Sequence, residues 1–406
     1  MLQNKVPNVR FCKYLDIWKT TKLNRITEII GGGTPDTKQF SYWNGGINWF
    51  SPTEVGKTVY LTKSEKTISQ LGLQKSSAKL LPAFKTILFT SRAGIGDVGI
   101  LTEESATNQG FQSLVVNEET DVYFLYSYSD QIKKYALKHS AGSTFLEISG
   151  KELGKMDLSI PSLPEQQAIG SLFRTIDDLL ASYKDNLANY QSLKETMISK
   201  MFPKAGQTVP EIRLDGFEGE WEEKKLSEIV DIVGGGTPDT NVKEYWDGEI
   251  NWFSPTEVGN SIYLYTSEKR ISELGLQKSS AKILPANRTI LFTSRAGIGS
   301  VGIITKDSTT NQGFQSLVTK KGIDIYFLFS YSSEITRYAL KHSAGSTFLK
   351  ISGKELGKMD IIIPTFAEQQ AIGAYFSNLD NLINSYQEKI TQLEILKKKL
   401  LQDMFI

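Results

Sequence analysis

Two long stretches of the chain carry apolar side chains at intervals of three and four residues. In the first stretch these positions are Ile169, Leu172, Ile176, Leu179, Tyr183, Leu187, Tyr190, Leu193, Met197 and Met201. In the second they are Ile372, Tyr375, Leu379, Leu382, Tyr386, Ile390, Leu393, Leu396, Leu400 and Met404. A narrow apolar stripe sustained over about ten turns is typical of a helix that packs against another helix. We therefore predict two long helices that pack on each other, with these seam residues: Leu179, Tyr183, Leu187, Leu382, Tyr386 and Leu393.

A different pattern precedes the first long helix. From residue 47 to 125 short apolar runs alternate with Gly, Pro, Asn and Ser, and their β-branched and aromatic content is typical of strands. The predicted strands are "INWF", "TVYL", "TILFT", "VGIL", "SLVV" and "VYFLYSY". Residues 129–140 have Ile132, Tyr135 and Ala136 on one helical face and predict a helix. The pattern therefore predicts a mixed α/β (α+β) fold.

The whole pattern occurs twice, with a constant offset of 203 residues. "GGGTPDT" begins at Gly31 and again at Gly234, and "LFTSRAGIG" at 88–96 returns at 291–299. Within 138–157 the copies differ only at Glu147, which is Lys350 in the second copy. Each repeat is large enough to form a core of its own. The segments we predict are a globular domain (1–160), a helix (161–203), a linker (204–222), a second domain (223–363) and a second helix (364–406).

The composition is that of an ordinary globular protein, but positive charge is concentrated in one stretch of each copy. The chain is 40% apolar and 22% charged, with net charge +1 and a single cysteine, Cys12. It has no apolar run long enough to cross a bilayer and no secretory signal, so we expect a cytoplasmic protein. Between Glu65 and Asp97, however, the only charged residues are five cations, and the second copy repeats this. Such a stretch favours contact with phosphates, although an unevenly charged surface would give the same pattern.

Catalytic and nucleotide-binding motifs find little support in the sequence. "GGGTPDT" lacks the GK[ST] of a phosphate-binding loop, and Pro35 breaks the spacing of a dinucleotide fingerprint, so we interpret it as a turn. The only histidines are His139 and His342, one per copy, which cannot build a typical zinc site. A base at His139 acting on Ser140 or Ser143 would need triad geometry that sequence neighbours rarely have. We predict a binding protein without catalytic residues, cofactor or metal.

Polar residues repeated in both copies are the candidates for binding DNA. Arg, Asn and Gln read base edges, and Lys, Ser and backbone amides contact phosphates. The candidates in the first copy are Lys75, Ser76, Ser77, Lys79, Arg92, Asn108, Gln109, Gln112, Lys138, Ser143 and Thr144. Their equivalents are Lys278, Ser279, Ser280, Lys282, Arg295, Asn311, Gln312, Gln315, Lys341, Ser346 and Thr347. Alternatively, Asn108 and Gln109 cap a turn and Arg92 pairs with a buried carboxylate.

In these segments the chain resembles the DNA-specificity subunits of type I restriction–modification systems. The matching pieces are "GGGTPDT…YW…INWFSPTEV", "ILFTSRAGIGDVGI…ATNQGFQSL", "SAGSTFLEISGKELGKMDLSIPSLPEQQAIG" and the helix that follows. The resemblance implies two target-recognition domains, each followed by a spacer helix, with the helices forming an antiparallel coiled coil. It also implies two modification subunits, which methylate adenine with S-adenosylmethionine, and restriction subunits, which use ATP and Mg.

The two recognition domains of that family usually differ, whereas here they are nearly alike. We therefore expect a bipartite, palindromic, gapped target in double-stranded DNA. Two other functions stay open at this point: a protein-interaction module on a coiled-coil stalk, and a nuclease with an unrecognised site. Salt-dependent DNA binding would separate the first from DNA recognition, and magnesium-dependent cutting would favour the second.

Overall fold

The computed structural model describes residues 6–92, 94–142, 146–204, 206–295, 297–345 and 349–405. The chain forms two compact units. Unit 1 contains residues 1–185 and 388–406, and unit 2 contains residues 186–387. Each unit therefore combines one copy of the globular repeat with the beginning of one long helix and the end of the other.

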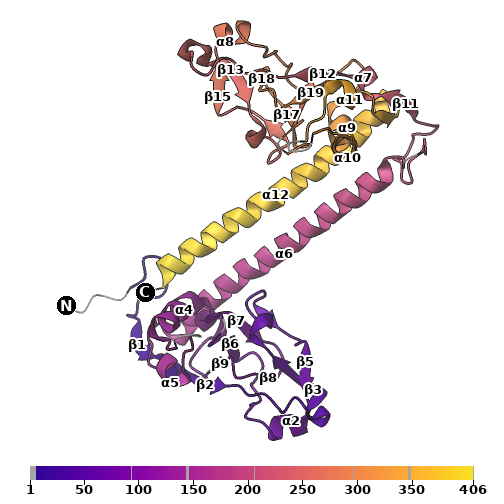
Figure 1. Cartoon of the computed structure of the whole chain (residues 1–406). Coiled ribbons are helices and arrows are strands. Elements are labelled where there is room, and N and C mark those ends of the chain that lie inside the picture. The colour runs from indigo at the N-terminus through magenta and orange to yellow at the C-terminus, as the bar shows by residue number, and fades with distance from the viewer. Residues whose placement is uncertain are drawn as a thin grey trace. The chain divides into compact units, whose positions relative to one another are not determined.

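Unit 1 is built on a five-stranded sheet with the strand order β2-β9-β6-β7-β4 (Figure 1). Its strands are β2 (Thr27–Gly31), β4 (Tyr60–Leu61), β6 (Thr86–Phe89), β7 (Val98–Leu101) and β9 (Gln112–Val116). A second sheet has the order β5-β3-β8, and β1 pairs antiparallel with β10. These strands are β1 (Lys19–Lys22), β3 (Trp43–Phe50), β5 (Lys66–Ile68), β8 (Ser105–Thr107) and β10 (Asp157–Ile160).

The strand predictions hold for most of these elements, because alternation and β-branched content reflect burial in a sheet. β6 is the central strand, and all four of its residues are buried, which explains its continuous apolar run. A hydrophobic core cluster that includes Phe50, Leu88 and Phe111 packs against this sheet. A smaller hydrophobic cluster, which includes Trp49 and Ile68, lies at the three-stranded sheet. The mixed α/β class is confirmed.

The prediction of a strand at "VYFLYSY" is wrong. Residues Val122–Ser127 form helix α3, because the Asp121 carboxylate accepts the Phe124 N–H at 2.8 Å and caps the first turn. Tyr123, Phe124 and Leu125 are all buried, so a continuous apolar run does not distinguish a buried helix from a buried strand. The other helices of the globular part are α1 (Leu23–Ile26), α2 (Gln70–Gln74), α4 (Ser129–His139) and α5 (Gly150–Leu153), with 3-10 turns η1 (Phe40–Tyr42) and η2 (Pro52–Glu54).

Unit 2 repeats this architecture in the same order. Its five-stranded sheet is β12-β19-β16-β17-β14, with β15-β13-β18 and β11-β20 beside it. The strands are β11 (Glu222–Lys225), β12 (Val230–Gly234), β13 (Trp246–Phe253), β14 (Tyr263–Leu264), β15 (Lys269–Ile271), β16 (Thr289–Phe292), β17 (Val301–Ile304), β18 (Ser308–Thr310), β19 (Gln315–Thr319) and β20 (Asp360–Ile363). The helices are α7 (Leu226–Ile229), η3 (Lys243–Tyr245), η4 (Pro255–Glu257), α8 (Glu273–Gln277), α9 (Ile325–Ser330), α10 (Ser332–Lys341) and α11 (Gly353–Leu356).

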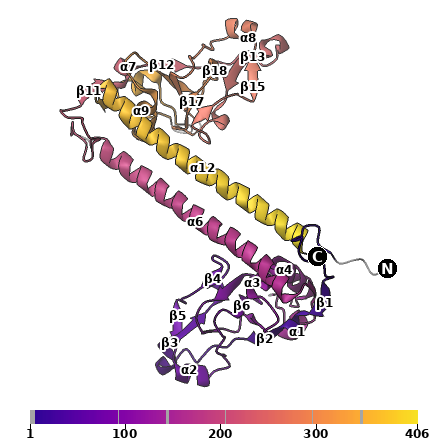
Figure 2. The same ribbon diagram turned by 180° about the vertical axis from the view of Figure 1, so that it is seen from behind.

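The two long helices are α6 (Leu163–Met201) and α12 (Phe366–Met404), as the apolar stripes predict. In unit 1 the first half of α6 lies beside the last half of α12, where Lys184 Nζ is 2.7 Å from Glu394 Oε1 (Figures 1 and 2). In unit 2 the last half of α6 lies beside the first half of α12, where the rings of Tyr190 and Tyr386 stack at 5.5 Å. Both pairings run antiparallel.

The seam differs from the predicted one by one position in each helix. Leu179 and Leu382 are 40% and 43% exposed, whereas their neighbours Leu180 and Ile383 are each 8% exposed. Each of these pairs offers an apolar residue at both candidate positions, so the spacing alone does not choose between them. Tyr183, Leu187, Tyr386 and Leu393 are intermediate in exposure.

A search of the described helices for a membrane-spanning segment finds none with both the length and the hydropathy that crossing a bilayer requires.

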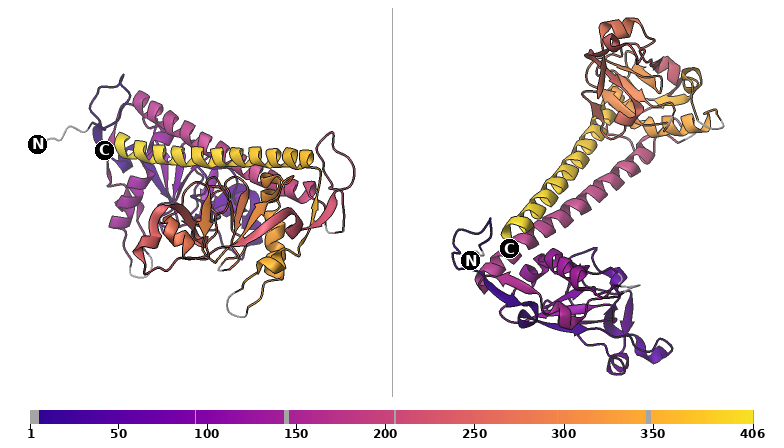
Figure 3. Two further views of the ribbon diagram at one scale, coloured as in Figure 1. Left: turned by 90° about the horizontal axis from the view of Figure 1, so that it is seen from above. Right: turned by 60° about the vertical axis from the view of Figure 1, so that its left-hand side comes forward.

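A clamp holds the start of α6 to the N-terminal segment of unit 1. The guanidinium of Arg10 donates to both carboxylate oxygens of Glu165, at 2.6 and 2.7 Å, and the Glu165 side chain is only 1% exposed. The hydrogen bond to Glu165 raises the pKa of Arg10. The backbone N–H of Val9 donates to Asp403 at 3.0 Å, so this segment lies beside the end of α12 (Figure 3). Arg213 and Glu368 form the equivalent clamp in unit 2.

Candidate nucleic-acid interface

The glycine turn lies between two of the loops that carry candidate residues. A Cβ at Gly32 would lie 2.0 Å from the backbone oxygen of Asn108, and a Cβ at Gly33 would lie 2.2 Å from Ser77 Oγ. The indole N–H of Trp49 donates to the Gly33 oxygen at 2.9 Å and so fixes the turn to β3. Glycine is required here because the backbones approach closely. The run "GGGTPDT" is therefore a packing element between loops, which agrees with its interpretation as a turn.

The loop at 75–79 presents two lysines to solvent. Lys75 is the C-cap residue of α2, and Lys75, Ser77 and Lys79 are exposed. Ser76 is half-buried: its hydroxyl contacts the Leu73 oxygen at 3.4 Å and accepts the Ala78 N–H at 3.3 Å. Ser76 therefore shapes the loop, and Lys75, Ser77 and Lys79 stay available to a ligand.

The loop at 107–110 has one structural amide and one exposed amide. Asn108 Oδ1 accepts the N–H of Gly110 at 2.7 Å, which is the turn-capping role given above as the alternative for this residue. Gln109 is exposed, and its Oε1 accepts the hydroxyl of Thr34 at 2.5 Å. Gln112 is half-buried on β9, where its Oε1 lies 2.6 Å from the position that a Cβ of Gly150 would take. Gln109 is the amide of this loop placed to reach a ligand.

Arg92 is held next to the same loop. The N–H of Ser91 donates to the Gly110 oxygen at 2.8 Å, and Arg92 forms a β-bridge with Glu147. The Arg92 Nη1 atom is 3.9 Å from Glu147 Oε2, and the two side chains are 35% and 47% exposed. The carboxylate beside Arg92 is therefore exposed, and the alternative of a buried partner is wrong. In unit 2 the residue opposite Arg295 is Lys350.

The remaining candidates lie at the end of α4 and beyond it. Lys138 is exposed in the last turn of α4, and Ala141 bridges to Glu147. Ser143, Thr144, Ser346 and Thr347 lie outside the described residues. The His139 ring stacks on Tyr135 at 4.1 Å, and the Ser140 hydroxyl donates to the Leu137 oxygen at 3.0 Å. Ser140 is thus engaged with the backbone rather than with a catalytic base.

These contacts connect segments that are far apart in the sequence into one surface. We call it the glycine-loop surface, and it consists of residues 31–34, 75–79, 91–92, 107–110 and 147. Unit 2 has the same contacts: a Cβ at Gly235 would lie 2.0 Å from Asn311 O, and the Ser294 N–H donates to Gly313 at 2.7 Å. Solvent-accessible lysine, arginine and glutamine side chains gathered on one surface can contact phosphates and base edges.

A second set of polar residues, which the sequence patterns did not single out, joins each globular part to the helices. Asp177 on α6 accepts the Tyr123 hydroxyl at 2.8 Å and the Lys397 ammonium at 2.5 Å. Burial, followed by the charge of Asp177, raises the pKa of Tyr123 and keeps its hydroxyl protonated as a donor. Asp380 accepts from Tyr326 and Lys194 in unit 2 in the same way. An Asp inside an apolar stripe, repeated in both copies, was the available signal.

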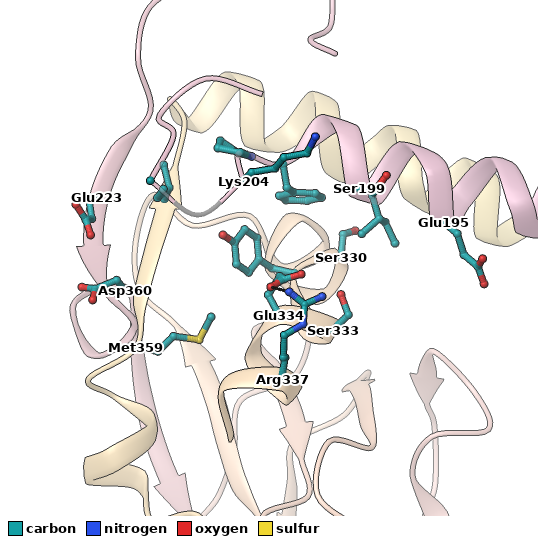
Figure 4. Close-up of a pocket in the computed structure, with 16 residues that line it drawn as sticks. Glu195, Ser199, Lys204, Glu223, Ser330, Ser333, Glu334, Arg337, Met359 and Asp360 are labelled. Carbon is teal, nitrogen blue, oxygen red and sulfur yellow. Dashed lines mark hydrogen bonds and ion pairs between the residues drawn. The ribbon is translucent and has the colours of Figure 1, made fainter. Parts of the chain in front are cut away.

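Unit 2 also contains a cavity of about 750 Å³ at the end of α6 (Figure 4). Its lining comes mainly from α6, β11, α9, α10 and β20 and from the residues that follow α6, and none of these segments belongs to the glycine-loop surface. Its charged side chains include Arg337, which donates to Glu334 at 2.6 Å, and Asp360, which pairs with Lys225 outside the cavity lining. The cavity is therefore a feature of the junction between helix and globular part.

Comparison with known proteins agrees with the two-fold repeat. Residues 16–189 and 218–395 each match the type I restriction modification DNA specificity domain. The chain is 38% identical over 192 residues to the type I restriction enzyme MjaIX specificity subunit of Methanocaldococcus jannaschii, covering 46% of this chain and 44% of that protein. It is 32% identical over 190 residues to the EcoR124I/EcoR124II specificity subunit of Escherichia coli, covering 45% and 46%. The match thus spans about half the length of these relatives.

A solved structure shows that the fold extends over the whole chain. The S subunit of the type I restriction–modification system from M. genitalium superimposes with a TM-score of 0.64 over 99% of both chains, at 15% identity. A chain from a structure of complex assembly in the type I R-M system superimposes with a TM-score of 0.51 over 95% of this chain, at 18% identity. Because the two matches to the DNA specificity domain together cover most of the chain, the chain belongs to the type I restriction–modification DNA specificity family.

Proposed function

We propose that this protein recognises a bipartite sequence in double-stranded DNA, one half-site through the glycine-loop surface of each unit. The observation that carries the proposal is the contact between Gly31–Thr34 and the loops at 75–79 and 107–110. It gathers the exposed Lys75, Lys79 and Gln109 on one surface, and unit 2 has the same residues in the same places. Lysines position a protein on the phosphate backbone, and Arg or Gln side chains read bases.

The target follows from the repeat and the helices. Two nearly identical surfaces should read nearly identical half-sites. In each unit α6 and α12 pair antiparallel, the start of one helix beside the end of the other. Exchanging the two sequence copies leaves this pairing unchanged, which is the property of a two-fold axis. A two-fold protein reads an inverted repeat in duplex DNA. The target is therefore a gapped palindrome, with half-site centres separated by a distance comparable to about one helical turn.

In the proposed complex this chain supplies recognition and the partners supply chemistry. Two modification subunits bind to it and methylate adenine with S-adenosylmethionine. Restriction subunits, which use ATP and Mg, join them to cut DNA. This chain is the non-catalytic scaffold, and the helix pair is the element that spaces the two recognition surfaces. Support comes from the family membership and from the DNA specificity domain that occurs twice.

Mapping of methylated adenines tests the proposal most directly. The chain is expressed with the modification subunit of its own system, and genomic DNA from those cells is sequenced for modified bases. The expected result is one motif with two inverted, nearly identical half-sites and an unspecific spacer. Two unrelated half-sites or a direct repeat would contradict the symmetric target. If no methylation depends on the chain and the pure protein binds no duplex at low salt, a protein-interaction module becomes the better function.

A further inference from the structure

Equivalent hydrogen bonds close the turn that follows Arg92 in unit 1 and Arg295 in unit 2. In unit 1 the Thr90 hydroxyl donates to the Gly94 oxygen at 2.6 Å and accepts the Asp97 N–H at 2.9 Å. In unit 2 Thr293 makes the same two hydrogen bonds, to Gly297 at 2.6 Å and from Ser300 at 2.9 Å. The turn that carries Arg92 in one copy and Arg295 in the other is therefore closed in the same way.

The charges on this turn differ between the units. In unit 1 Arg92 faces Glu147, and Lys133 Nζ lies 3.4 Å from Asp97 Oδ1. Both carboxylates are missing from unit 2, where Glu147 is replaced by Lys350 and Asp97 by Ser300. Lys133 is replaced by Thr336, whose hydroxyl contacts the Gly299 oxygen at 3.4 Å. At these positions unit 1 therefore has two cations and two carboxylates. Unit 2 has two cations, Arg295 and Lys350, and no carboxylate.

The position of Lys350 makes the difference local. Arg295 and Lys350 form an antiparallel β-bridge, and the Ile351 N–H donates to the Ser294 oxygen at 3.1 Å. Side chains directly opposite in such a bridge have Cβ atoms about 4.5–5.5 Å apart and leave on the same face. Neither cation has an ion-pair partner among the described residues. Like charges placed opposite each other cost stability unless an anion lies between them.

We propose that Arg295 and Lys350 bind a backbone phosphate of DNA, and that unit 1 lacks this site because the Glu147 carboxylate lies beside Arg92. The inference rests on the proposed function and goes beyond it: the two units read similar half-sites but hold them with unequal strength. A phosphate that approaches Arg92 is repelled by the carboxylate beside it. A phosphate that approaches Arg295 meets two cations. Unit 2 therefore contributes more of the salt-dependent affinity.

The test exchanges single residues between the copies in the full-length chain. Lys350→Glu gives unit 2 the residue of unit 1, and Glu147→Lys does the reverse. The net-charge control is Lys321→Glu, an exposed site after β19 where unit 1 has Glu118. Each substitution copies the residue found at the equivalent position, so folding should persist, and circular dichroism checks it. The probe is a fluorescein-labelled mixed-sequence duplex of about 30 base pairs, titrated at several salt concentrations.

We expect Lys350→Glu to lower the salt slope, the dependence of log affinity on log salt, by about 1 and to weaken binding about tenfold at low salt. Glu147→Lys should raise the slope by a similar amount, and Lys321→Glu should have a much smaller effect. Equal effects of Lys350→Glu and Lys321→Glu would overturn the inference. So would loss of modification-subunit binding with DNA binding intact, which would assign the pair to an acidic protein surface. A wild-type chain that binds no duplex would instead contradict the proposed function.

Discussion

At the scale of single residues, the sequence identifies repeated polar positions but not which of them face solvent. Asn108 and Gln109 are neighbours with similar chemistry, yet Asn108 caps a turn and Gln109 is exposed. The decisive contacts join loops separated by about 75 residues, such as Thr34 and Gln109. Sequence order does not encode such contacts, whereas the requirement for glycine at Gly32 and Gly33 records them indirectly.

The clamp between Arg10 and Glu165 gives a prediction at this scale. Replacing Arg10 with Met leaves a carboxylate that is 1% exposed without its cation. Breaking a buried ion pair from one side costs about 3–5 kcal/mol, so the free energy of unfolding of unit 1 should fall by about that amount. Urea denaturation followed by circular dichroism measures it. Replacing Lys22 with Met is the matched control, because its pair with Asp157 is exposed and worth about 1 kcal/mol or less.

At the scale of elements, periodicity predicts the long helices well and their seam less well. The stripe persists over α6 and α12 because each buries a narrow face against another helix. Where two apolar residues are adjacent, as at Leu179 and Leu180, either fits the spacing, and only packing decides. The short helix α3 was predicted as a strand for a related reason: three consecutive residues, Tyr123, Phe124 and Leu125, are buried.

The seam can be tested with neighbouring positions. Leu180→Glu places a charge at a site that is 8% exposed, and it should destabilise the helix pair strongly. Burying a Leu contributes about 1.5–3 kcal/mol, and an unpaired buried charge adds a further cost. Leu179→Glu, at a site 40% exposed, should change the free energy of unfolding by about 0.5 kcal/mol or less. Equal loss of stability in both variants, measured by thermal unfolding, would show that the seam is wrongly placed.

At the scale of the whole molecule, the compact units do not coincide with the two sequence repeats. Unit 1 takes residues 388–406 from the end of the second repeat, and unit 2 begins at residue 186, inside α6. The repeat of 203 residues predicts two domains and two helices. It does not predict which half-helix completes which unit, because antiparallel pairing is a long-range contact.

This exchange leads to the last prediction, that a fragment of residues 1–203 forms a homodimer. Alone, the fragment lacks residues 388–406, which supply Lys397 to Asp177 and Phe405 to a ring cluster with Trp18, Phe124 and Tyr128. A second copy can supply Lys194 and Phe202 instead, since these residues make the equivalent contacts in unit 2. The expected result is a dimer in sedimentation equilibrium that recognises the same palindrome. Lys194→Met should weaken dimerisation, because it leaves the buried Asp177 carboxylate unpaired. A monomeric, folded fragment would contradict the interchangeability of the two half-helices, and a dimer unaffected by Lys194→Met would show that another surface joins the copies.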